Sequence, residues 1–161
     1  MSEQPFGGTP ITPGLVRNYR LEVATYTGDS APTEWSRVVG MKNYTPLANN
    51  KSREDDSDFD SNGRATQVST TISSEISGTV KIAEGGVETV PAHKILNDAG
   101  AQTGSDGFVH YREVHTVTGE GWEGVADADF TRSGGEQGAL THADFSLSVR
   151  SAVPYTAPVT P

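Results

Sequence analysis

Cysteine is absent from the 161 residues, and several classes of function are excluded with it. A chain without thiols has no disulfide, no thiolate nucleophile and no zinc–thiolate site. Apolar side chains are also scarce, because Leu, Ile, Val and Phe together supply only 31 residues and aromatic residues only 7%. Such a small apolar fraction beside a net charge of −9 predicts a thin core. We therefore expect partner molecules to provide part of the stabilising burial.

Long apolar runs and clusters of basic residues are missing as well. No stretch approaches the ~18 consecutive apolar residues of a membrane helix. The N-terminus Met1-Ser2-Glu3-Gln4-Pro5 has neither the basic start nor the apolar run of a signal peptide. The sequence therefore predicts no membrane association and no export by a signal peptide. The 12 basic residues are scattered and outnumbered by 21 acidic ones, which argues against tight binding to a phosphate backbone.

What the chain does contain favours β-structure, since Val, Thr and Ser are abundant. Pro91 and Gly100 bracket the only candidate helix, over residues 92–99. Apolar and polar residues alternate in several other segments, which is typical of half-buried strands. The expected strands cover residues 19–27, 34–41, 68–82, 107–118, 122–132 and 139–149. The fold class that follows is mainly β, a β-sandwich or open barrel with one short flanking helix.

The longest alternating segment covers residues 66–83. Its even positions from Val68 to Ile82 are largely apolar and its odd positions are polar. Fully extended, it would span roughly 60 Å, whereas a compact domain of this size is roughly 40 Å across. The strand must therefore bend, with Gly78 as one place for it, or project from the domain.

Extended or irregular segments are expected on either side of these elements. Residues 1–17 and 154–161 are rich in proline and are predicted to form N-terminal and C-terminal arms. Between them, residues 18–153 would form a single β-sandwich domain. A polar stretch within it predicts a long inter-strand loop over residues 42–65, and loops of this length are usually functional or disordered.

Two motifs suggest chemistry, and both have simpler interpretations. Asp58, Asp60 and Asn62 match the first half of a calcium-binding loop, but position twelve is Ser69, so the alternative is a solvated acidic turn. The segment 119–124 spells a dinucleotide-binding fingerprint without the following helix that the motif needs, so we expect a hairpin turn. No catalytic residue and no cofactor is assigned.

The order of features resembles a known family. Glu34-Trp35-Ser36-Arg37-Val38-Val39-Gly40 runs into Tyr44-Thr45-Pro46, followed by the acidic segment 55–63 and the long Ser/Thr strand ending Ile76-Ser77-Gly78-Thr79-Val80. A short helix, the segment 108–113 and the closing segment 145–150 come next. This arrangement resembles the major tail tube protein of bacteriophages with long, non-contractile tails, of the kind common in phages of actinobacteria.

The resemblance implies a tail-tube-like β-sandwich whose copies form rings of six. The rings would stack into a tube around the tape-measure protein and later the DNA, which passes without sequence-specific binding. Other implied partners are the tail terminator and distal tail proteins, and the implied location is the virion tail, assembled in the host bacterial cytoplasm. Contacts between rings would use residues 42–65 and the two arms. The implied inter-ring loop residues are Pro46, Lys51, Arg53, Glu54, Asp55, Asp56, Asp58, Phe59 and Asp60.

The polar face of the long strand is our candidate for the wall of the tube. We expect it to face the lumen, the alternative being the outside solvent. Its residues are Ser69, Thr71, Ser73, Glu75, Ser77 and Thr79.

Three alternatives to a phage tail tube subunit remain open at this point. A monomeric β-sandwich module that binds carbohydrate or a receptor would display aromatic side chains on a rigid face. A tube protein of a contractile injection system would share the ring fold and bind a sheath outside. A small β-barrel enzyme is the third.

Overall fold

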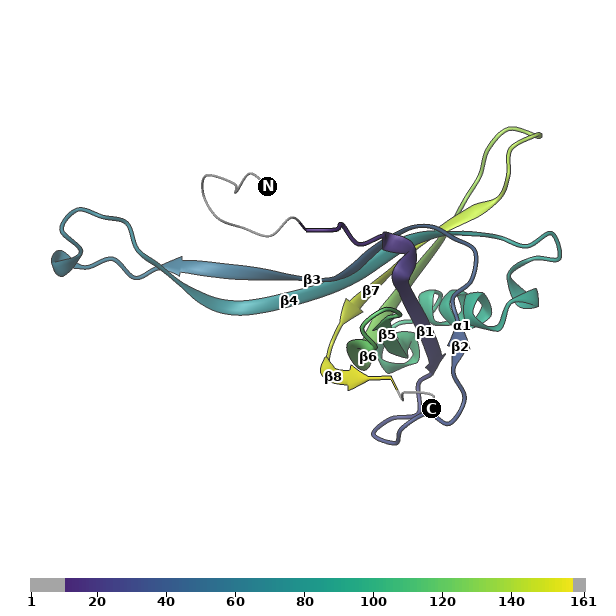
Figure 1. The fold of residues 1–161 in the computed structure, drawn as a ribbon, viewed down its shortest axis with the longest axis horizontal. Coiled ribbons are helices and arrows are strands. Elements are labelled where there is room, and N and C mark those ends of the chain that lie inside the picture. Colours follow the sequence, from purple (N-terminus) through teal and green to yellow (C-terminus); the bar gives the residue numbers. More distant parts are fainter. Residues whose placement is uncertain (1–10, 158–161) are drawn as a thin grey trace, which may run out of the picture.

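A computed structural model describes residues 11–157 of the protein, and Figure 1 shows its elements. The strands are β1 (Tyr19–Thr25), β2 (Ser36–Arg37), β3 (Met41–Asp55), β4 (Gln67–Lys81), β5 (Phe108–His115), β6 (Glu120–Ser133), β7 (His142–Val149) and β8 (Val153–Thr156). The helix α1 covers Pro91–Gly100. Short 3-10 helices cover Val16–Asn18, Phe59–Ser61, Val87–Thr89 and Gly104–Gly107. No helix in this part of the chain is long and apolar enough to span a membrane.

The eight strands form one antiparallel sheet, in the order β2-β1-β5-β6-β7-β4-β3. Strand β6 connects its two halves: residues 121–127 pair with β5 and residues 126–133 pair with β7. β8 pairs with the beginning of β6, on Glu120 to Glu123. The chain turns between β5 and β6 at Gly119, whose φ of 76° suits glycine, so residues 119–124 contain the expected hairpin turn.

The sheet curls so that strands far apart in its order come into contact. The rings of Tyr19 on β1 and Tyr44 on β3 lie 5.9 Å apart between centroids. The amide of Leu47 on β3 donates a hydrogen bond of 3.0 Å to the Glu113 carboxylate on β5. These contacts close the sheet around a core, which is the mainly β sandwich or open barrel that the sequence predicted.

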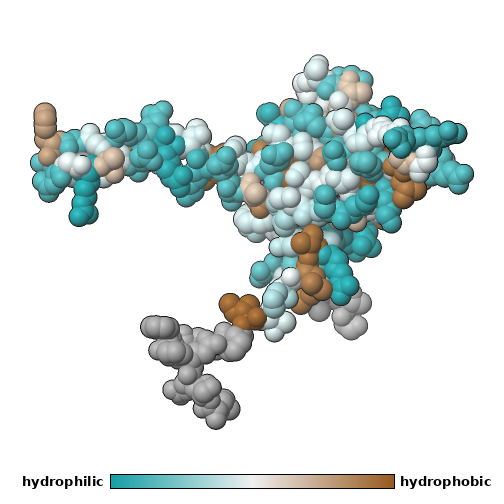
Figure 2. All heavy atoms as spheres, turned by 90° about the horizontal axis from the view of Figure 1, so that it is seen from above, coloured by the Kyte–Doolittle hydropathy of each residue, from teal (hydrophilic) through white to brown (hydrophobic). Residues whose placement is uncertain are grey.

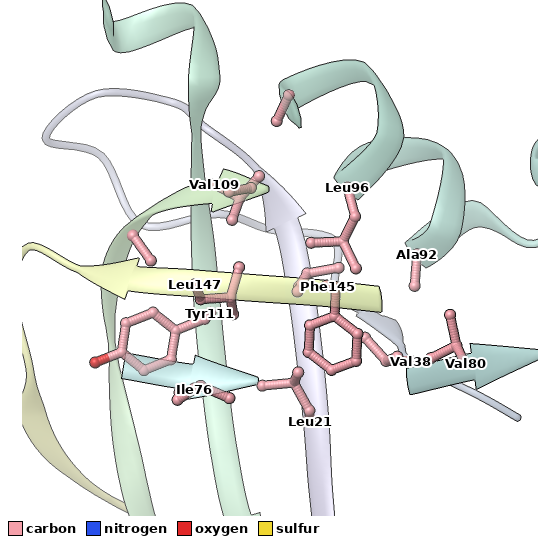
Figure 3. Close-up of a cluster of buried hydrophobic side chains, with 14 of the residues drawn as sticks. Leu21, Val38, Ile76, Val80, Ala92, Leu96, Val109, Tyr111, Phe145 and Leu147 are labelled. Carbon is pink, nitrogen blue, oxygen red and sulfur yellow. The ribbon is translucent and has the colours of Figure 1, made fainter. Parts of the chain in front are cut away.

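The core fills the inside of the curled sheet, and α1 covers its open side (Figure 3). Leu96 and Ala92 point from α1 toward Phe145 of β7 and Val80 of β4, and all four are buried. Pro91 occupies the first turn of α1. Proline has no backbone N–H, but at this position an N–H would have no partner within the helix, so no hydrogen bond is lost. The predicted helix over residues 92–99 is therefore confirmed, one residue longer at each end.

The segment 42–65, expected to be a loop, is mostly strand, and this expectation was wrong. Residues 41–55 form β3, which pairs with β4 over its whole length, so only residues 56–66 connect the two. The strands form a long β-hairpin that projects from the body of the protein (Figure 1), which is one of the two alternatives that the length of the predicted strand left open. Its outer half is solvated on both sides, so β3 shows no apolar alternation for sequence reasoning to detect.

The ends of the chain differ partly from the expected arms. Residues 11–15 have no regular structure and are exposed, as expected for an arm, and residues 1–10 lie outside the described part. At the other end, β8 occupies residues 153–156, so the expected C-terminal arm begins as a strand paired with β6. Residues 158–161 are not described. The strand expected over 34–41 is only two residues long. Only Ser36 and Arg37 pair with β1.

Candidate functional site

The outer face of strands β4, β7 and β6 carries rows of polar residues that lie directly opposite one another. We call this surface the acidic face. Because opposite residues of paired strands point to the same side of a sheet, each row presents its side chains together. The rows are Thr79–Asp144–Thr131, Ser77–Ser146–Asp129 and Glu75–Ser148–Asp127.

The chemistry of the acidic face is uniform. Its nine residues are four carboxylates and five hydroxyls, with no lysine or arginine among them. The Thr79 hydroxyl donates to the Asp144 carboxylate at 2.7 Å, so neighbouring strands are also linked through side chains. All nine side chains are exposed or half-buried. Such a surface holds water well and repels phosphate groups.

The predicted lumen residues divide between the acidic face and the hairpin. Glu75, Ser77 and Thr79 lie on the acidic face, where β4 pairs with β7. Thr71 and Ser73 continue the same side of β4 beyond the end of that pairing, on the projecting hairpin, and Ser69 follows them after a shift of register with β3. Sequence reasoning missed the contribution of β6 and β7. The alternation of Asp144, Ser146 and Ser148 with buried residues signals an exposed face, but only the register places them beside β4.

The hairpin itself carries most of the predicted inter-ring residues. Lys51, Arg53, Glu54 and Asp55 are exposed at the outer end of β3, and Asp56, Asp58, Phe59 and Asp60 lie in the turn. Phe59 is fully exposed at the tip. Pro46 is the exception, because it lies at the base of the hairpin against the body. Figure 2 shows the hairpin as a mainly hydrophilic rod with few apolar patches.

The acidic turn is held by its own carboxylates. The Asp55 carboxylate accepts the amide of Ser57 at 2.8 Å, and the Ser57 hydrogen bonds lower the pKa of Asp55. The Asp58 carboxylate accepts the amide of Asp60 at 3.0 Å, and Asn62 adopts a φ of 52°. Across residues 11–157, no three acidic, histidine or cysteine side chains converge to hold a metal ion. The candidate cation residues Asp58, Asp60 and Asn62 lie in this turn, and the choice between a cation site and a solvated acidic turn stays a prediction.

A groove of about 610 Å³ lies at the base of the hairpin, and we call it the hairpin-base groove. Its walls are aromatic rings and prolines from four separate segments of the chain. A buried carboxylate, Glu113, lies at its inner end, and Glu120 is exposed at its edge. The lining residues are Tyr19, Pro46, Leu47, Glu113, His115, Thr118, Glu120, Gly121, Trp122, Pro154, Tyr155 and Thr156.

Burial is the main influence on the pKa of Glu113, and it raises the pKa of this carboxyl group. Hydrogen bonds from the amide of Leu47 and the hydroxyl of Tyr44 act in the opposite direction and lower it. Burial and the nearby Glu113 carboxylate together raise the pKa of Tyr44 far above its ordinary value. The backbone packs closely here, since a Cβ on Gly121 would fall 1.7 Å from the Glu113 carbonyl oxygen.

Arg112 fastens two peripheral segments to the outer side of β5. Its guanidinium lies 4.2 Å from the ring centres of Trp35 and Tyr155, and it donates to the Glu123 carboxylate at 3.0 Å. Arginine is suited to this position because its planar cation stacks on rings while its N–H groups bind a carboxylate. Through Tyr155, this contact holds β8 beside the hairpin-base groove.

Comparisons with known proteins were made for the whole chain. No family model and no curated protein matches it. Solved structures do: the SPP1 tail tube has a TM-score of 0.65 and 15% identity, covering 92% of this chain and 82% of the other. The tail of a gene transfer agent particle has a TM-score of 0.68 and 11% identity, covering 90% of this chain and all of the other. The sheath-tube complex of an extracellular contractile injection system has a TM-score of 0.54 and 9% identity, covering 90% and 93%.

The chain has the tail tube fold. This confirms the fold that the sequence resemblance implied, since the matches cover nine-tenths of the chain. The matches come both from the SPP1 tail tube and from a contractile injection system, so fold alone does not say which kind of tube the chain would form.

Proposed function

We propose that the protein is a structural subunit of the tail tube of a phage with a long, non-contractile tail. It assembles into rings of six, and the rings stack into a channel through which DNA is ejected. The acidic face, presented on a tail tube fold, carries this proposal. It acts without catalysis or a cofactor, in the virion tail after assembly in the bacterial cytoplasm.

The acidic face accounts for passage of DNA without binding. Four carboxylates per subunit, repeated around a ring and along a stack, make the wall strongly negative. Their field extends about 8 Å at physiological salt, so phosphates are kept from close contact. Hydroxyl groups between the carboxylates hold water at the wall, and DNA then slides along a hydrated surface.

Exposed apolar residues and free strand edges support self-assembly. Val68 and Ile72 on the hairpin are 50% and 61% exposed, and Ile11 on the arm is 88% exposed. Among the described strands, β3 has a neighbour on one edge only, which leaves an edge free for another copy. We assign residues 42–65 and the two arms to contacts between rings. The tape-measure, tail terminator and distal tail proteins are further partners by resemblance.

Electron microscopy of the purified protein over a concentration series tests self-assembly. We expect hollow rings or tubes at high concentration, with a matching increase in sedimentation coefficient. A particle that stays monomeric at every concentration would contradict the proposal and favour the monomeric binding module.

Single-cysteine labelling tests which face lines the channel, and the natural absence of cysteine makes the experiment clean. Ser148→Cys places a thiol on the exposed acidic face, and Lys94→Cys places one on the exposed side of α1. We expect a maleimide on a large polymer to react with both in monomers but only with the Lys94→Cys thiol in tubes. Equal reaction of both thiols in tubes would place the acidic face outside.

The structural likeness to a contractile injection system supports a second candidate, a tube surrounded by a sheath. The outer surface of a tube in a contractile system contacts a second protein, the sheath, whereas a non-contractile tube assembles alone. Co-sedimentation of the assembled protein with a sheath protein therefore distinguishes the two candidates.

A further inference from the structure

The hairpin-base groove has the chemistry of a binding site for a basic side chain. Trp122 and Tyr155 supply aromatic walls, and Glu113 and Glu120 supply carboxylates. No lysine or arginine lines the groove, so neither carboxylate meets a cation there. A buried carboxylate near aromatic rings favours an approaching ammonium group both by charge and by cation–π contact.

One face of the projecting hairpin complements this groove. Lys51 lies directly opposite Ile72, so their side chains share a face of the hairpin. Ile72 is 61% exposed, although Ile76 and Val80 on the same side of β4 are fully buried in the core. The face therefore presents a cation beside an apolar side chain that has little cover within residues 11–157.

We propose that Lys51 of one copy binds in the hairpin-base groove of a second copy, with its ammonium group between Glu113 and Glu120. Ile72 would then pack against Trp122 and Tyr155. This inference rests on the proposed tube function and names the contact that links the copies. The two surfaces differ and lie on one chain, so the contact is head-to-tail, the kind that generates rings and filaments.

Geometry excludes the same contact within one copy. Leu47 lines the groove and Lys51 follows it on the same extended strand, about 13 Å farther from the groove. The hairpin cannot fold back without breaking its pairing with β4. Lys51 therefore reaches such a groove only in another copy.

The register selects Lys51 over the other basic residues of the hairpin. Arg53 lies two residues beyond Lys51 on the same face of β3, but its partner is the polar Ser69, and Arg64 lies in the connection beyond the strands. Of these three basic residues, only Lys51 lies directly opposite an apolar side chain.

A charge exchange tests the contact. Lys51→Glu and Glu120→Lys should each raise the concentration needed for assembly by at least about tenfold, because like charges then meet. The double variant restores an opposite pair and should assemble close to the unmodified protein. Arg37→Glu and Glu136→Lys, exposed charges outside the contact and outside the segments assigned to ring contacts, are the matched controls and should each have little effect.

The outcomes separate this contact from the proposed function. If the unmodified protein assembles but the double variant assembles no better than the single variants, the proposed contact is wrong and the proposed tube function is unaffected. Single variants that assemble normally overturn the contact as well. If the unmodified protein never assembles, the proposed function itself fails. Circular dichroism of each variant monomer shows that the fold is retained, since both altered side chains are exposed.

Discussion

At the scale of single residues, Glu113 is the most unusual feature, a buried carboxyl group among aromatic rings. The amide of Leu47 donates a hydrogen bond to it, Tyr44 lies close to it, and Tyr19, His115 and Glu120 line the same groove. Burial of a charge costs free energy unless a partner offsets it. The carboxyl group therefore links the hairpin to the body at some cost in the isolated subunit.

Glu113→Gln should make the monomer more stable at neutral pH. The folded pKa of Glu113 is raised by burial, so the protonated form favours folding; its contribution is fully present below the unfolded pKa and is lost as pH rises through the folded pKa. Glutamine keeps an acceptor for the Leu47 amide and has no charge to bury. Denaturant unfolding of both proteins between pH 4 and pH 8 checks this.

The difference between the two proteins isolates this carboxyl group, since the other titrating groups are common to both. We expect the free energies of unfolding of the two proteins to converge at low pH and to separate as pH rises. Parallel curves, or a less stable variant at pH 8, would show that Glu113 is stabilised as a carboxylate.

Gly124 is a second residue-scale determinant, because the backbone passes very close to it. A Cβ there would fall 2.0 Å from the carbonyl oxygen of Ser151, at the point where β7 leads into β8. Gly124→Ala should destabilise the monomer by about 1–3 kcal/mol through overpacking. Gly138→Ala, with nothing within 4 Å of the added Cβ, is the control and should change stability by less than about 0.5 kcal/mol. Thermal unfolding measures both, and equal effects would argue against close packing at Gly124.

At the scale of elements, amphipathic strands and the helix were predictable and the hairpin was only half predictable. β1, β4, β7 and α1 each bury one face, so apolar residues recur with the period of the element. In β3 only Tyr44 is buried, and from Asn49 to Asp55 the strand is polar and exposed on both sides, like a loop. Its strand character comes from pairing with β4, a long-range effect that one segment cannot reveal.

The outer half of the hairpin should be removable without loss of the fold. Lys51 and Ile72 lie directly opposite each other, so replacing residues 52–71 with Asn-Gly closes a shorter hairpin in register. Isolated two-stranded hairpins are only marginally stable, so the deleted part contributes little to folding. We expect a monomer with nearly unchanged thermal stability that no longer forms stacked rings. Sedimentation and electron microscopy measure the effect, and normal tubes would contradict the inter-ring role of the hairpin.

At the scale of the whole molecule, the small apolar content of the sequence matches a body with a thin core and a long projection. The buried residues form one cluster inside the curled sheet, and apolar residues of the hairpin and arm remain exposed. Sequence reasoning predicted this need for partners from composition. It could not predict the acidic face, because Asp127, Asp129 and Asp144 meet Glu75, Ser77 and Thr79 only through the register of three strands.

A three-dimensional cryo-EM reconstruction of the assembled protein tests the account most directly. We predict a hollow tube of stacked six-membered rings in which the rows of β4, β7 and β6 line the channel and the hairpin reaches a neighbouring copy. A solid filament, or a channel lined by α1 with the carboxylates of Asp129 and Asp144 outside, would contradict it.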